Sequence, residues 1–74
     1  MDMSENLVHL IPQLEMLRAE GAVVVLKWDG ERRIDPHTVV ITRKDTDFVW
    51  RRDSSDIAKA LAAGIAEYRV QHPK

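Results

Sequence analysis

The chain has 74 residues, with 11 Lys or Arg against 12 Asp or Glu, so its formal net charge at neutral pH is −1. This length predicts a single domain spanning residues 1–74, and the balanced charge disfavours a protein that binds nucleic acid mainly by electrostatics. The absence of cysteine excludes disulfides and thiolate zinc sites, and the three histidines lie far apart in the sequence. We therefore expect no metal site and no cofactor.

No apolar run approaches the roughly 18 residues that a membrane helix needs. The N-terminus also lacks the basic and apolar regions of a secretory signal. Together with the absence of cysteine, these features favour a cytoplasmic protein with no membrane partner. A domain of this size buries only about 60% of its unfolded surface. Without a disulfide or a metal, it is most simply stabilised by association with another chain.

The first predicted element is a helix with one apolar face. Ser4 is a suitable N-cap, and Glu5 lies near the positive end of the helix dipole. Gly21 is a natural C-terminal stop. Pro12 interrupts the hydrogen-bond pattern, but the apolar spacing continues across it, which favours one bent helix. The apolar face is formed by Leu7, Leu10, Ile11, Leu14 and Leu17.

Three strands are predicted next, at Ala22–Asp29, His37–Arg43 and Phe48–Arg52, because each is rich in β-branched or aromatic residues. The pair Asp29-Gly30 is typical of a tight two-residue hairpin turn with positive φ. The segment that follows, Glu31–Pro36, is charged and ends in a proline that cannot donate to a ladder. It is therefore predicted to be irregular.

The turn before the third strand, Lys44–Asp47, is rich in side chains that bond their own backbone. After that strand, Asp53–Asp56 supplies N-caps and acidic residues for a second helix from about Ser55 to Val70. This helix carries a clear apolar stripe. The stripe consists of Ile57, Ala58, Leu61, Ala62, Ile65 and Tyr68.

The order α-β-β-β-α with short connections predicts an α+β fold, in which a three-stranded antiparallel meander is covered on one face by both helices. The alternation of strand side chains then divides the apolar residues between two faces. The predicted core is Leu7, Leu10, Leu14, Leu17, Val24, Leu26, Trp28, Val39, Ile41, Phe48, Trp50, Ile57, Leu61 and Ile65. The other face keeps Val23, Val25, Val40 and Val49, with Thr38 and Thr42.

An uncovered sheet face with four valines predicts a surface for a partner. On this basis we expect a non-enzymatic binding or regulatory module that acts through protein–protein association, as a homodimer through the open face or through an exposed strand edge. The alternative interpretation is ordinary β-propensity, with Lys27, Arg51 and the threonines keeping the face hydrated.

Catalytic chemistry has little support in the sequence, and we expect no enzyme. Ser54 and Ser55 have no histidine nearby in the sequence and lie in no nucleophile elbow. The acidic pairs at Asp45 and Asp47, and at Asp53 and Asp56, lack the further oxygen ligands of a calcium loop. Turn and cap chemistry accounts for these acids.

The element order resembles that of double-stranded RNA-binding domains across nearly the whole chain, and Asp35-Pro36-His37 is similar to the Pro–His loop with which such domains enter the RNA minor groove. The resemblance implies a nucleic-acid-binding alternative. The family's lysine-rich start of the last helix is replaced here by Asp53–Asp56, with only Lys59 one turn later. The candidate nucleic-acid contacts are Arg32, Arg33, His37, Arg43 and Lys44.

Overall fold

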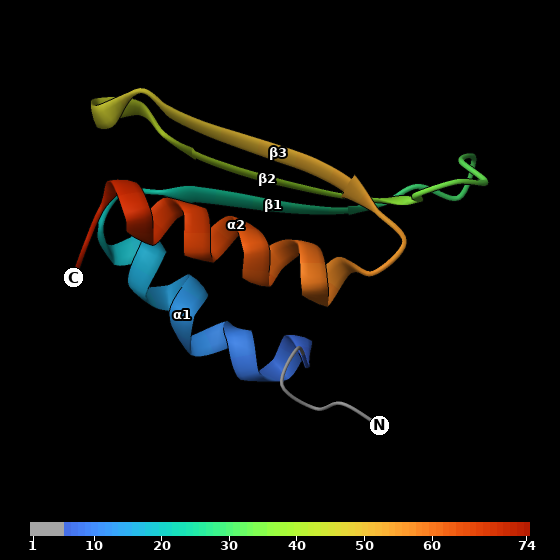
Figure 1. The fold of residues 1–74 in the computed structure, drawn as a ribbon, viewed down its shortest axis with the longest axis horizontal. Helices are drawn as coiled ribbons and strands as arrows, with labels where there is room; N and C mark the ends of the chain where they lie inside the picture. Colours follow the sequence, from blue (N-terminus) through green and yellow to red (C-terminus); the bar gives the residue numbers. More distant parts are fainter. Residues whose placement is uncertain (1–5) are drawn as a thin grey trace.

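The structure, a computed structural model, describes residues 6–74. Two helices and a three-stranded antiparallel sheet follow in the predicted order α-β-β-β-α, with the strands adjacent in chain order. Both helices lie on the same side of the sheet (Figure 1). Within the described residues no helix is long and apolar enough to cross a bilayer. The elements are α1 (Leu7–Ala19), β1 (Val23–Trp28), β2 (His37–Arg43), the 3-10 turn η1 (Lys44–Thr46), β3 (Phe48–Ser54) and α2 (Ile57–Gln71).

The N-cap of helix α1 is Asn6, whose side-chain oxygen accepts a hydrogen bond from the N–H of Val8 at 2.9 Å. The predicted cap Ser4 and its neighbour Glu5 lie outside the described residues. The helix continues through Pro12, which confirms that one helix spans this stretch. The proline removes one backbone hydrogen bond from the helix interior, and its ring faces solvent.

The end of α1 confirms the role predicted for Gly21, which has a φ of +100°. Its N–H donates to the carbonyl of Arg18 at 3.0 Å, and the N–H of Ala22 donates to the carbonyl of Leu17 at 3.0 Å. These two bonds form a Schellman motif, which satisfies the last carbonyls of the helix. The chain then turns directly into β1.

The prediction of a tight two-residue turn at Asp29-Gly30, between β1 and β2, is wrong. Gly30 does not have a positive φ, and the positive φ in this loop belongs to Asp35 at 49°. The Asp29 carboxylate accepts a hydrogen bond from the N–H of Glu31 at 3.0 Å. The N–H of Asp29 donates to the carbonyl of Pro36 at 2.8 Å. This side-chain turn diverts the chain before a two-residue hairpin can close, and Glu31–Pro36 is irregular as predicted.

Strand β3 runs to Ser54, beyond the predicted end at Arg52, so Asp53 belongs to the sheet. Its assignment to the start of α2 was wrong because its carboxylate accepts a hydrogen bond across the sheet from Thr38 at 2.7 Å. The N-cap of α2 is Asp56, whose carboxylate accepts from the N–H three residues later at 3.1 Å.

The core lies between the sheet and the helices. Its buried members are Leu10, Leu17, Ala22, Val39, Ile41, Ala60, Leu61, Ile65 and Tyr68. The partly buried residues packed against them are Leu7, Leu14, Val24, Leu26, Phe48, Trp50, Ile57 and Ala62. One predicted core residue is wrong: Trp28 is 58% exposed. It is the last residue of β1, where the strand runs on toward the loop beyond the helices (Figure 1), and it makes an edge contact with His37.

Candidate interaction surface

The sheet face turned away from the helices is the candidate site, and the strand register orders it into three rows. Each row takes one side chain from β1, one from β2 and one from β3. The rows are Val23–Thr42–Val49, Val25–Val40–Arg51 and Lys27–Thr38–Asp53. We call this three-by-three array the open face. It contains all six residues predicted for a partner surface.

The first two rows hold a contiguous apolar patch, the valine cluster, formed by Val23, Val25, Val40 and Val49. Three of these valines are between 50% and 74% exposed, while Val40 in the central strand is half-buried. Val25 and Val40 are direct cross-strand neighbours, Val23 lies two residues from Val25 on β1, and Val49 lies diagonally across from Val40. Thr42 lies between Val23 and Val49 in the first row. The predicted patch is therefore assembled by the register as a single surface.

The third row is covered by the chain itself, through an arrangement that we call the Arg32 cap. The guanidinium of Arg32 lies over Thr38 and donates to its hydroxyl at 2.7 Å. It also pairs with Asp53 at 3.3 Å. Thr38 is consequently only 4% exposed. The expectation that Thr38 is open to a partner was wrong, because a side chain from the β1–β2 loop folds back onto it.

Charged neighbours extend this cap along the same edge of the open face. Asp29 pairs with Lys27 at 3.3 Å, and Arg51 pairs with Asp53 at 3.3 Å. The hydrogen bond from the N–H of Glu31, together with Lys27, lowers the pKa of Asp29. The hydrogen bond from the Thr38 hydroxyl, with help from nearby arginines, lowers the pKa of Asp53. Both carboxylates are therefore firmly ionised at neutral pH.

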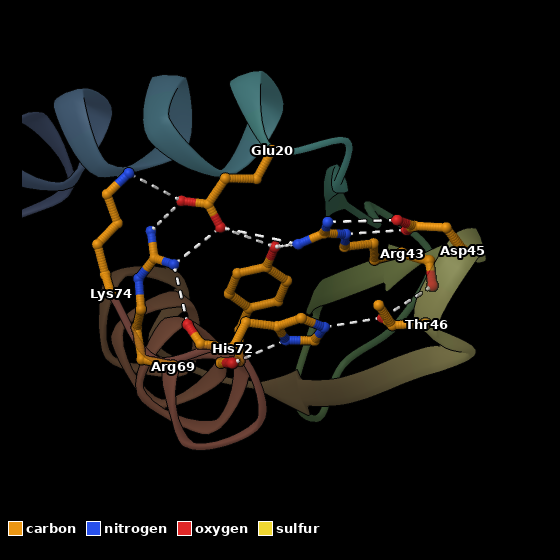
Figure 2. A network of polar contacts seen from close by, with 8 residues as sticks. Glu20, Arg43, Asp45, Thr46, Arg69, His72 and Lys74 are labelled. Carbon is orange, nitrogen blue, oxygen red and sulfur yellow. Dashed lines mark hydrogen bonds and ion pairs between the residues drawn. The ribbon is translucent and has the colours of Figure 1, made fainter.

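A second polar network, centred on Glu20, joins the ends of α1 and α2 to the end of β2 (Figure 2). Arg69 donates to both Glu20 carboxylate oxygens at 2.8 Å, and the buried Tyr68 hydroxyl donates to one of them at 3.0 Å. Lys74 approaches the same carboxylate at 3.5 Å. The hydrogen bond from Arg69 is the main reason that the pKa of Glu20 is lowered to about 2. We call this network the Glu20 clamp.

Arg43 belongs to the Glu20 clamp. Its guanidinium donates to the Tyr68 hydroxyl at 3.0 Å and to Asp45 at 2.9 Å. The pKa of Arg43 is raised by these partners, with Asp45 contributing most. Sequence reasoning did not find this network, because Glu20 and Arg69 lie 49 positions apart and no local spacing links them.

The five residues proposed for nucleic-acid binding do not form one surface. Arg43 and Lys44 lie at one end of β2 or just beyond it. Arg32, Arg33 and His37 lie at the other end or in the loop before it, and seven extended residues separate the two ends by about 20 Å. In addition, Arg32 is engaged in its cap and Arg43 in the Glu20 clamp. Arg33 and Lys44 are exposed.

A groove of about 420 Å³ lies between α1 and the edge strand β1. Its walls include Leu14, Glu15 and Arg18 of the helix and Val23, Val24 and Leu26 of the strand. The charged members Glu15 and Arg18 pair with each other at 3.0 Å. The groove therefore presents an apolar wall and no unmatched charge that would select a ligand.

Ser54 has a structural role. The Ser54 hydroxyl accepts from the N–H of Asp56 at 3.0 Å and donates to its carbonyl at 3.1 Å. The nearby His37 ring contacts the Ser54 backbone carbonyl at 3.2 Å, away from the hydroxyl. Among residues 6–74 no group of three or more His, Cys, Asp or Glu side chains could hold a metal ion.

Comparison with known proteins adds no relative to this description. No protein-family model matches the chain, and searches of curated proteins and of solved structures found no match. What is established is a small α+β fold with an α-β-β-β-α order. The function is argued from the surface alone.

Proposed function

We propose that this chain is a non-enzymatic association module that works through the open face of its sheet and pairs with itself as a homodimer. The observation that supports the proposal is the contrast within this one face. The chain covers the polar row with its own Arg32, yet it leaves the neighbouring valine cluster bare. Contiguous exposed apolar patches rimmed by polar residues are typical of interaction surfaces.

The strand composition adds to the argument. Exposed faces of antiparallel sheets are usually polar, and threonine or lysine at Val23, Val25 or Val49 would keep the strand conformation without the exposed apolar area. A partner that covers these positions would remove the valine side chains from water. Each buried methylene-sized group then contributes about 0.8 kcal/mol.

The test is the molar mass of the purified chain by size-exclusion chromatography with light scattering over a concentration series. We expect the mass to rise from monomer toward dimer. The variant Val49→Lys should stay monomeric because it places a charge within the valine cluster, at the most exposed of its four positions. Val70→Lys is the matched control, since Val70 is 68% exposed against 74% for Val49 but lies on α2.

The masses of the wild type and the two variants decide whether the open face is the association surface. If Val49→Lys abolishes the rise in mass while Val70→Lys does not, the open face is the association surface. If the wild-type mass is independent of concentration, or if a folded Val49→Lys still dimerises, the proposal is wrong. Far-UV circular dichroism of both variants shows whether the fold is kept.

A further inference from the structure

We infer that the second copy sits on the open face about a two-fold axis that runs parallel to β2, and that Lys27 and Asp53 set this arrangement. The inference rests on the proposed function, because it describes how that same face is occupied. It follows from the three rows of the open face and from the requirement that a two-fold interface be complementary to itself.

When two identical sheets meet face to face, the two-fold axis lies in the plane of the contact. An axis parallel to β2 places β1 of one copy over β3 of the other, row against row. Val23 then meets Val49 of the second copy, so the first row is apolar on both sides. In the third row Lys27 meets Asp53 of the second copy on each side of the axis, so symmetry makes this contact twice. The Arg32 guanidiniums that cover Thr38 face each other on the axis, each paired with Asp53 of its own chain.

The middle row also fits. Val40 meets Val40 on the axis, and Val25 meets the aliphatic stem of Arg51. The guanidinium of Arg51 already pairs with Asp53 of its own chain at 3.3 Å, so its charge stays neutralised at the rim. Strands from the two copies run in nearly the same direction, which is the aligned packing that face-to-face sheets adopt.

The other aligned arrangement, with the axis across the strands, is much less complementary. It reverses the rows, so that Val49 meets Asp53 and Val23 meets Lys27. It also places Arg51 against Arg51, just as the axis parallel to β2 places Arg32 against Arg32, so opposed arginines do not distinguish the two arrangements. Apolar groups that face charges disfavour a contact, and only the axis parallel to β2 pairs Lys27 with the oppositely charged Asp53. The charge pattern of the open face therefore selects the axis parallel to β2.

The size of the face predicts a weak, reversible dimer. Three strands of three rows cover roughly 14 Å by 20 Å, or about 300 Å² on each copy. Even with contributions from its margins, this contact is smaller than the 1,200 Å² or so of total area found in stable complexes. Dissociation on dilution is therefore expected, and the charged pairs at the third row matter for which arrangement forms.

A charge-swap experiment tests the arrangement. In Lys27→Glu alone, two acidic groups meet at each third-row contact. In Asp53→Lys alone, two lysines meet there. Each single variant should dimerise at least about tenfold more weakly than wild type, because like charges are opposed twice. An equimolar mixture pairs opposite charges at both contacts. It should form a heterodimer with an affinity close to that of the wild-type homodimer.

Disulfide trapping gives a second measurement that does not depend on Asp53, whose replacement removes its bond to Thr38. The chain has no cysteine, so a single one can be introduced. With the axis parallel to β2, Thr42 faces Thr42 of the second copy, so Thr42→Cys should form an oxidised dimer. Val25→Cys should not, because Val25 faces Arg51. The axis across the strands gives the opposite pattern.

The outcomes separate this inference from the proposed function. Heterodimer preference in the mixture and trapping through Thr42→Cys support the axis parallel to β2. A dimer that Val49→Lys dissociates, but that shows no heterodimer preference and is trapped through Val25→Cys, keeps the proposed function and overturns the inference. If the chain dimerises but neither cysteine variant is trapped, the inference is also wrong. Edge-to-edge pairing of strands would give this result.

Discussion

Gly64→Ala is the sharpest test of how closely α2 packs on the sheet. A Cβ added at Gly64 would lie 2.6 Å from Cζ3 of Trp50 and 2.8 Å from Cδ1 of Ile41. Carbon atoms in contact prefer about 3.5–4.0 Å, so both neighbours would have to move by about 1 Å. Ile41 is fully buried and has little room to do so.

Two effects of opposite sign decide the outcome. Alanine is a better helix former than glycine by about 1 kcal/mol. Overpacking of a core typically costs about 1–3 kcal/mol, and the short contacts to two side chains place this site toward the upper end. We therefore expect Gly64→Ala to lower the free energy of unfolding by about 1–2 kcal/mol, which in a domain of this size lowers Tm by roughly 5–15 °C.

The assay is urea denaturation followed by circular dichroism, with Ala66→Gly as the control. Ala66 is exposed on the same helix, so its replacement should cost only the helix propensity, about 1 kcal/mol. In a Trp50→Leu background the cost of Gly64→Ala should shrink, because the indole ring is gone. An increase in stability for Gly64→Ala in the wild-type background would refute the close packing of α2.

Three further predictions concern the polar contacts. Thr38→Val should lower the stability by about 1–2 kcal/mol in the same urea assay, because it removes the hydroxyl that bridges Arg32 and Asp53. Glu20 has a pKa of about 2 in the fold against an ordinary value of 4.5, so wild-type stability should fall as the pH drops from 4.5 toward 2, and Glu20→Gln should flatten this part of the profile. A short RNA duplex at low salt should show no measurable binding, since the candidate basic residues lie at opposite ends of β2.

Each of these predictions has a contrary result. An unchanged stability for Thr38→Val would mean that the Arg32 cap is not held by the hydroxyl. A Glu20→Gln variant that keeps the full acid dependence would place the critical carboxylate elsewhere. Duplex binding that weakens steeply with salt would favour the nucleic-acid alternative, because the release of counterions from phosphates produces such a dependence.

The local patterns of the sequence predicted much of the fold. Strand β2 was predicted to the residue, at His37–Arg43. The end of α1 at Gly21 could be predicted, because it depends only on the positive φ of this glycine and on the adjacent helix. The division of strand side chains between two faces also held, since it depends only on the two-residue repeat. Each of these features depends on residues that are close together in the sequence, and for that reason it could be predicted from the sequence.

The errors involve partners far away in the sequence. Trp28 follows the alternation of the core-facing residues, yet it lies at the end of a strand, and no local pattern shows where a helix stops covering the sheet. Asp53 resembles a helix cap until its strand partner Thr38 is known. The Arg32 cap depends on a loop that folds back, and charge alone did not distinguish Arg32 from its exposed neighbour Arg33.

The open face is best understood as two halves that the chain treats differently. Thr38 is shielded from solvent by the loop residue Arg32, which donates to its hydroxyl and pairs with the carboxylates of Asp29 and Asp53. Among the residues that the structure describes, no such side chain shields the valine cluster, and three of its members are at least half exposed. A face that only needed to remain soluble would gain from polar residues at both ends. The combination of a charged end that can match its own two-fold image and a bare apolar end is what a self-complementary contact requires.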